Sequence, residues 1–206
     1  MKSPNKQYHH GDLRTSLITS ATLMLQESGI DSLSLRKLAE RVGVSRTAAY
    51  HHFKDKNDLL SAIAAQGFMQ WQQQAEQTFN NPALSVKEMY QEFVHNYVQF
   101  AYQNPAIYQL MFGNTLWKNN NSSNELKNTA YPSFQYQVNI VKTLQEKALM
   151  PKSQSALRLA QVTWATLHGL AQLVIDGIYA DASHLNEMCD CAIELFLSNS
   201  PASHQK

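Results

Sequence analysis

The chain has 206 residues, of which 44% are hydrophobic and 16% are charged, and its formal net charge is +1. This length suits one sizeable domain or two small ones, and so small a net charge does not by itself indicate a nucleic-acid-binding protein. The sequence has no run of 18 apolar residues, and residues 1–14 lack the apolar core of a signal peptide. We therefore expect a cytoplasmic protein with no membrane partner.

The pattern of apolar residues favours helices throughout. Gly and Pro number only seven and six, apolar residues recur every three or four positions, and no convincing run alternates β-branched and polar residues. We therefore predict an all-α fold of about nine helices. Residues 1–10, with Lys2, Lys6, His9 and His10, are expected to form a flexible arm. A first helix is expected from Asp12 to Ser28.

The segment from Leu33 to Leu60 reads LSLRKLAERVGVSRTAAYHHFKDKNDLL and predicts two short helices and the start of a third. Ser34 is a good N-cap for a helix that Gly43 would end. Ser45 would cap a second helix from Arg46 to His52 or Phe53. Only seven or eight residues long, this helix must be held by packing.

A helix pair joined by a tight turn that contains Gly is a helix-turn-helix, whose second helix can enter the major groove of DNA. Arg46 and Thr47 lie where side chains reach base edges, and Arg36 is a second candidate base reader. Hydrogen-bond donors to phosphates are expected at Ser34, Ser45, Tyr50, His51, His52 and Lys56. The alternative is a solvated helix pair within an ordinary α-helical protein. The arm formed by residues 1–10 has two open interpretations: it contacts DNA, or it takes no part in binding.

Further helices are expected along the rest of the chain. Asp55, with Asp58, would cap a long helix that tolerates Gly67 and rigidly links the two parts of the chain. A polar loop is expected at 113–124, and Pro132 is a candidate kink. The predicted helices after Asp55 are Lys56–Phe79, Ser85–Gln103, Pro105–Phe112, Glu125–Ala148, Ser153–Tyr179 and Ser183–Ser198.

The segment around the helix pair resembles the N-terminal DNA-binding domain of the TetR family of bacterial transcriptional regulators. The matching pattern covers roughly residues 10–60: Gly29 and Leu33, then LRKLAERVGVS, then Y-x-H-F-x-x-K-x-x-L-L from Tyr50 to Leu60. The resemblance implies phosphate contacts from Tyr50, His52 and Lys56. It implies base contacts from Arg36, Arg46 and Thr47. Ala48 is small where other members carry a hydroxyl, so only a thymine methyl contact is expected there.

Aromatic residues are frequent after residue 60, and a helical domain with many large rings can enclose an apolar ligand pocket. The alternative for any one ring is plain core packing. The candidate pocket residues are Phe68, Trp71, Phe93, Tyr97, Tyr108, Phe112, Tyr131, Trp164 and His168.

The segment NPAIYQLMFG and the run from Trp164 to Gly169 resemble the effector domain of one TetR subgroup with a Trp…His-Gly signature. The resemblance implies that this helix lies between the pocket and a dimer interface, and that the last two helices form a homodimer. Gly169 would permit close helix approach. His168 is open to two roles, contact with a ligand or a structural hydrogen bond.

The predicted domains are an arm (1–10), a DNA-binding head (11–55), an effector and dimerisation domain (56–200) and a tail (201–206). Residues 1–60 hold nine Lys and Arg against six Asp and Glu, whereas residues 61–206 hold eight against ten. The basic excess therefore coincides with the head. Cys189 and Cys191 point about 200° apart on a helix and suit reduced, structural thiols.

These features predict a homodimeric repressor that binds double-stranded DNA at a palindromic operator and is released by a small apolar or amphipathic ligand. The alternative is a DNA-binding protein of the same fold that a protein partner regulates, or that has no small-molecule effector. An enzyme ranks well below both, since no catalytic trio, metal-ligand cluster or phosphate loop is apparent in the sequence. No catalytic residue, metal or cofactor is expected.

Overall fold

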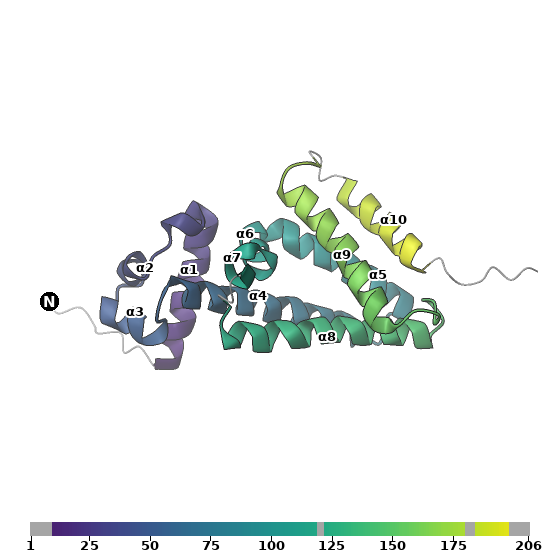
Figure 1. Cartoon of the computed structure of the whole chain (residues 1–206), viewed down its shortest axis with the longest axis horizontal. Coiled ribbons are helices and arrows are strands. Elements are labelled where there is room, and N and C mark those ends of the chain that lie inside the picture. Colours follow the sequence, from purple (N-terminus) through teal and green to yellow (C-terminus); the bar gives the residue numbers. More distant parts are fainter. Residues whose placement is uncertain (1–9, 119–121, 180–183, 198–206) are drawn as a thin grey trace, which may run out of the picture. The chain divides into compact units, whose positions relative to one another are not determined.

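The computed structural model describes residues 10–118, 122–179 and 184–197. The predicted arm before His10 and the predicted tail lie outside the described residues. Every regular element in these ranges is a helix, so the all-α prediction is confirmed. The helices are α1 (His10–Ser32), α2 (Leu35–Val42), α3 (Arg46–His52), α4 (Lys56–Phe79), α5 (Val86–Gln103), α6 (Pro105–Phe112), α7 (Asn114–Trp117), α8 (Asn124–Glu146), α9 (Ala156–Ile175) and α10 (Leu185–Leu197) (Figure 1).

The chain divides into two compact units. Unit 1 comprises Met1–Gly67 and Ala106–Lys127, and unit 2 comprises Phe68–Pro105 and Asn128–Lys206. The helices α4 and α8 therefore begin in unit 1 and end in unit 2. This division differs from the predicted boundary at residue 56, because the first half of α4 and nearly all of α6 belong with α1–α3.

Within the described residues, no helix combines the length and apolar character that crossing a bilayer requires.

The helices α2 and α3 begin and end where their capping residues predict. Ser34 Oγ accepts a hydrogen bond from the Lys37 amide at 3.3 Å, and Gly43 ends α2 with a left-handed φ of 77°. Ser45 Oγ accepts from the Ala48 amide at 3.1 Å. These contacts satisfy backbone groups that a helix terminus leaves free. The predicted helix pair and its short turn are confirmed.

Packing holds the seven-residue α3, as its length requires. The backbone of α1 leaves the helical conformation at Gly29, with a φ of 72°, close to the predicted end of that helix. The fully buried side chains of this part of unit 1 include Leu17, Leu33, Leu38, Ala49, Phe53, Leu59 and Leu60. The helices α1–α4 thus share one apolar core.

The long helix α4 starts at Lys56, as predicted. Asp55 Oδ1 accepts from the Asp58 amide at 2.8 Å, and Asp58 Oδ2 accepts from the Lys54 amide at 3.1 Å. The capping arrangement is therefore reciprocal, although the second bond reaches Lys54 and not the cap residue itself. The helix then continues without interruption to Phe79.

Gly67 lies where α4 packs against α6. A β-carbon at Gly67 would lie 2.7 Å from Ile107 Cγ2 and 2.7 Å from Met111 Sδ. Only a hydrogen atom fits at these separations. The sequence indicated that Gly67 is tolerated in the helix, and the packing of α6 supplies the reason.

Substitution of Gly67 by alanine is expected to lower the free energy of unfolding by about 1–3 kcal/mol, the usual cost of overpacking a core. Ile107 is β-branched and cannot easily swing away. Urea denaturation of the full chain measures the effect. The control is Gln70→Ala, an exposed residue of the same helix, which should change the free energy of unfolding by no more than about 0.5 kcal/mol. Equal losses in both variants would contradict the packing argument.

Unit 2 is organised around α5, which packs against α9 and α10 (Figure 1). A capping box starts α5: the Ser85 amide donates to Glu88 Oε2 at 2.8 Å, and the Glu88 amide donates to Ser85 Oγ at 3.3 Å. The side-chain and backbone hydrogen bonds from Ser85 lower the pKa of Glu88. The buried residues of α5 are Tyr90, Phe93, Val94, Tyr97, Val98, Phe100 and Ala101.

The segment predicted as a polar loop at 113–124 contains the short helix α7. Leu116 is fully buried, and Trp117 Nε1 donates to the Met111 carbonyl at 2.7 Å. The buried leucine and this hydrogen bond hold the segment within unit 1, which explains why its polar composition was misleading.

The helix α9 is shorter than predicted at both ends, because a cap begins it and a left-handed glycine follows it. Ser155 caps α9 by accepting from the Arg158 amide at 3.3 Å, and Gly177 follows the end of the helix with a φ of 70°. The helix α8 continues through Pro132.

Candidate nucleic-acid interface

The helix α3 presents four side chains outward. Arg46, Thr47, Tyr50 and His51 are exposed, whereas Ala49 is fully buried against the core. Residues four apart share a helix face, so Arg46 aligns with Tyr50 and Thr47 aligns with His51. We call these four residues the outward stripe of α3. Its position on a capped helix in a helix pair is that of a major-groove reader.

The two capping serines and Arg36 flank this stripe. Ser34 is half-buried, Ser45 is exposed, and each hydroxyl oxygen accepts a helix amide. Each hydroxyl keeps its own proton, which is available to a phosphate. Arg36 is exposed on α2. The predicted DNA contacts of these residues stay predictions.

Two of the residues predicted to contact phosphates already contact other residues of unit 1. Lys56 is half-buried, and its Nζ donates to the Ile30 carbonyl at 2.5 Å. The ammonium retains two further protons for a phosphate. His52 is half-buried, with its ring centroid 6.5 Å from that of Phe53. Both side chains are therefore positioned by the core of unit 1 before any DNA arrives.

Some basic side chains of unit 1 form ion pairs with carboxylates, and others keep an uncompensated positive charge. The Arg41 guanidinium donates to both Glu27 oxygens, and this hydrogen bonding lowers the pKa of Glu27 and raises that of Arg41. Arg36, Arg46 and Lys54 are exposed and form no ion pair with any described residue. The uncompensated positive charge thus lies on α2, on α3 and just before α4.

Sequence reasoning missed Arg14. Its Nη2 lies 2.7 Å from Glu125 Oε2 at the start of α8, and its Cζ lies 5.4 Å from the centroid of the Phe53 ring. Arg14 therefore connects the residue that ends α3 with the first turn of α8, within unit 1. The two charged partners are 111 positions apart, so no local pattern could reveal the pair.

In unit 2 several predicted pocket residues do meet. The Trp71 ring lies 6.0 Å from Phe93 and 5.9 Å from Tyr97 in edge-on contacts. Trp164 Nε1 donates to the Tyr97 hydroxyl at 2.9 Å, and the His168 ring lies 5.8 Å from Trp164. These five residues form the aromatic cluster of unit 2, which spans α4, α5 and α9.

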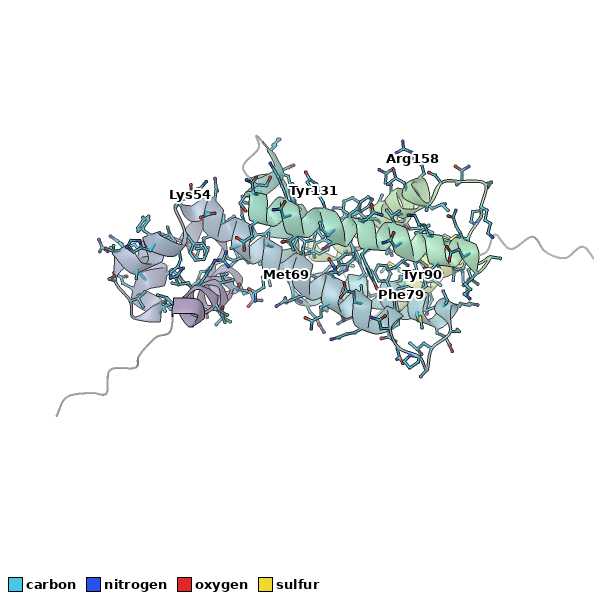
Figure 2. All side chains as sticks on the ribbon, turned by 90° about the horizontal axis from the view of Figure 1, so that it is seen from below. Lys54, Met69, Phe79, Tyr90, Tyr131 and Arg158 are labelled. Atoms are coloured by element: carbon cyan, nitrogen blue, oxygen red, sulfur yellow. The ribbon has the colours of Figure 1, made fainter. Side chains whose placement is uncertain are left out.

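The remaining pocket candidates are placed elsewhere. Tyr108 and Phe112 belong to unit 1, where their rings lie 4.8 Å apart. Tyr131 is 63% exposed on α8 (Figure 2), so its expected place in an interior pocket is wrong for the single chain. The reason is helix phase: the neighbouring residues Ala130 and Ser133 occupy the inner face of α8. Phe68 is buried at the start of unit 2.

His168 is half-buried, and desolvation lowers the pKa of its imidazole. The lowered pKa favours the uncharged form of the ring. A β-carbon at Gly169 would meet nothing within 4 Å in the single chain, so no helix of the same copy approaches closely there, and close approach by a second copy stays a prediction. Burial, and then the neighbouring Asp190 charge, raise the pKa of the Cys189 thiol to about 11, which keeps this free thiol unreactive.

Comparison with known proteins identifies the family. A family model described as bacterial regulatory proteins, tetR family, matches residues 17–63. A second, described as tetracyclin repressor-like, C-terminal domain, matches residues 90–196, more than half of the chain. The chain belongs to the TetR family. The predicted family is confirmed for both parts of the chain, and the Trp…His-Gly subgroup stays a prediction.

Curated relatives share only part of their length with this TetR-family chain. The tetracycline repressor protein class A from transposon 1721 of Escherichia coli is 49% identical over 49 residues, which are 24% of this chain and 23% of that protein. The HTH-type transcriptional regulator AcrR of Shigella flexneri is 40% identical over 52 residues, which are 25% of this chain and 24% of that protein. The chain thus matches about a quarter of the length of these relatives.

Solved structures match over nearly the whole chain. A protein of unknown function from Rhodococcus sp. RHA1 has a TM-score of 0.82 and 30% identity, covering 94% of this chain and 98% of that one. The fatty acid degradation regulator FadR from Bacillus halodurans has a TM-score of 0.68 at 15% identity, covering 97% of this chain and 99% of that one. The second likeness shows the fold alone.

Proposed function

We propose that this TetR-family protein is a cytoplasmic, homodimeric transcriptional repressor that binds a palindromic operator and is released by a small apolar or amphipathic ligand. The outward stripe of α3 is the main support. It combines an arginine, a hydroxyl, a phenol and an imidazole on one exposed face. The helix that carries them is short, capped and packed on a buried core, as a groove-reading helix must be.

Within this proposal the side chains divide into base readers and phosphate contacts. Arg46 and Thr47, at the N-terminus of α3, and Arg36 on α2 read base edges. The phosphate contacts come from Ser34, Ser45, Tyr50, His51, His52 and Lys56. Phosphate contacts fix the position of the protein on the duplex, while base contacts select the sequence.

The proposed dimer uses the outer faces of α9 and α10. Val162 is 60% exposed and Leu195 is 67% exposed in the single chain, and Leu157 on α9 is exposed as well. The outer face of α9 also carries Ala165 and Thr166. A helical surface with so many apolar groups suits a two-fold interface with a second copy of the chain. The dimer sets two copies of α3 at the spacing of a palindrome.

The proposed ligand domain is unit 2, whose aromatic cluster supplies apolar surface and hydrogen-bonding groups. A ligand that prefers one conformation of this unit alters DNA affinity by linkage between the two sites. A coupling of about 1–3 kcal/mol, equivalent to about 5–150-fold in affinity, is ordinary for such a system. The helix α4 is a suitable connection, because it starts beside the proposed DNA contacts and ends in unit 2.

Selection of DNA by the full chain from a random duplex pool tests the proposal. We expect enrichment of an inverted repeat whose half-site centres lie about 10 base pairs apart or a multiple of that spacing. Binding to the enriched duplex, followed by fluorescence anisotropy, is expected to weaken steeply as salt rises. Enrichment of an unsymmetrical motif, or of none, would refute the proposed operator binding.

A further inference from the structure

The hydroxyl of Tyr90 is the only fully buried side-chain polar atom in the described part of the chain that has no hydrogen-bond partner. Tyr90 lies on α5 among the helices of unit 2 (Figure 2), and only 2% of its surface is exposed. Buried hydroxyls are nearly always hydrogen-bonded, because an unsatisfied one loses its contacts with water and gains nothing in return. The Tyr90 hydroxyl therefore has no partner at hydrogen-bonding distance and angle among the described residues.

Thr163 on α9 interacts with the Tyr90 phenol and lowers its pKa, but the two hydroxyls do not meet the distance and angle of a hydrogen bond. The Oγ1 of Thr163 lies 2.9 Å from the Leu159 carbonyl and 3.2 Å from the Ala160 carbonyl, so its proton is committed to the backbone of α9. Burial raises the pKa of Tyr90, and this effect exceeds the opposite effect of Thr163. The phenol consequently keeps its proton and can donate it. Phe93 stacks beside the Tyr90 ring with centroids 6.1 Å apart, which makes the surroundings apolar.

The charges of unit 2 restrict what this partner can be. The buried polar residues of unit 2 are Thr78, Ser133, Gln137 and Thr163, together with the phenols of Tyr90 and Tyr97. All five Lys and Arg side chains of its described residues are exposed: Lys87, Lys142, Lys147, Lys152 and Arg158. Burial lowers the pKa of His168, the half-buried imidazole of α9, and so favours its uncharged form. A carboxylate or phosphate brought into this interior would lose its hydration without gaining a cation.

We propose that Tyr90 is the hydrogen-bonding anchor for an uncharged effector, an apolar molecule that carries a hydroxyl, carbonyl or amide oxygen. Tyr90 donates its proton to that oxygen, and the neighbouring rings contact the apolar body. This inference rests on the proposed function, because it assigns the ligand of the proposed ligand domain. It adds a residue outside the predicted pocket set and excludes acids as the preferred ligands.

Two matched pairs of probes test the charge requirement: 2-naphthamide with 2-naphthoate, and 1-octanol with octanoate. Binding to the full chain at pH 7.5, without DNA, is measured by isothermal titration calorimetry. We expect the uncharged member of each pair to bind more than about tenfold more tightly than its acid. Acids that bind as tightly as their partners, or four probes that all fail to bind at millimolar concentration, would overturn the proposal.

The substitution Tyr90→Phe tests the anchor itself. It is expected to weaken binding of the uncharged probes by about two- to tenfold. The control is Tyr102→Phe, on the same helix but 47% exposed, which should leave binding unchanged. Without ligand, Tyr90→Phe should melt at the same temperature as the unsubstituted protein or higher, because it removes an unsatisfied hydroxyl. A lower melting temperature, or unchanged probe affinity, would show that the hydroxyl is not a ligand anchor.

Operator binding separates the two proposals. Uncharged probes that bind through Tyr90 but leave operator affinity unchanged would refute ligand release and leave the anchor in place. A ligand that releases the operator and binds the Tyr90→Phe variant as tightly as the unsubstituted protein would refute the anchor and leave ligand release in place.

Discussion

Replacement of Arg46 by alanine is expected to weaken operator binding by about 1–3 kcal/mol and to relax base preference at one position of each half-site. Arg46 is exposed at the N-terminus of α3, the end of a recognition helix that contacts base edges, and it pairs with no described carboxylate. Anisotropy titrations against the selected operator and its single-base variants measure both effects. An Arg46→Ala protein with full affinity and selectivity would disprove its assignment as a base reader.

The contrasting variant is Lys56→Ala, which is expected to weaken binding to all sequences alike and to reduce the salt dependence by about one unit of slope. Lys56 contacts the Ile30 carbonyl, so this variant should also lose some stability, which thermal melting detects separately. Lys142→Ala, an exposed lysine of α8, is the matched control and should change neither affinity nor selectivity. A selectivity change in the Lys56 variant would make it a base reader.

Introduction of an aspartate at Val162 or at Leu195 is expected to dissociate the dimer and, with it, operator binding. Each position is more than half exposed in the single chain, so the fold tolerates the charge. In the proposed dimer the same carboxylate would be buried without a partner, which costs several kcal/mol. Sedimentation velocity reports the oligomer, and far-UV circular dichroism confirms that the helices persist.

Two companion proteins sharpen this test. Tyr102→Asp places the same charge at an exposed aromatic residue of α5 and should leave the dimer intact. Truncation after Tyr179 removes α10 and should abolish dimerisation. A dimer that survives both aspartate substitutions and the truncation would exclude α9 and α10 as the interface.

The helix boundaries of unit 1 were predictable because they depend on short-range hydrogen bonds. Ser34, Ser45 and Asp55 each accept an amide three residues further along the chain, and Gly43 adopts a backbone conformation that favours glycine. The starts of α2, α3 and α4 follow directly from these residues. The same kind of cap at Ser85 starts α5, at the residue where that helix was predicted to begin.

The residues that line a pocket were harder to predict than the helix boundaries, because the burial of a ring depends on which face of its helix packs against the neighbouring helices. Trp71, Tyr97 and Trp164 lie on three different helices and meet only after packing. Tyr131, of the same chemical type, lies on the outside of α8. The amino-acid composition shows that aromatic residues are frequent, but it does not show which of them come together in the core.

The sequence by itself determined the helix pair, the family and the outward stripe of α3, because caps, periodicity and motif spacing are properties of nearby residues. Only the tertiary structure decided the contact of Lys56 with Ile30, the link from Arg14 to Glu125, the close packing at Gly67 and the unsatisfied hydroxyl of Tyr90. The three contacts join residues that are far apart in the chain, and the fourth feature depends on which side chains surround Tyr90. Each depends on how helices pack, and packing is set by the shapes of all the side chains between them.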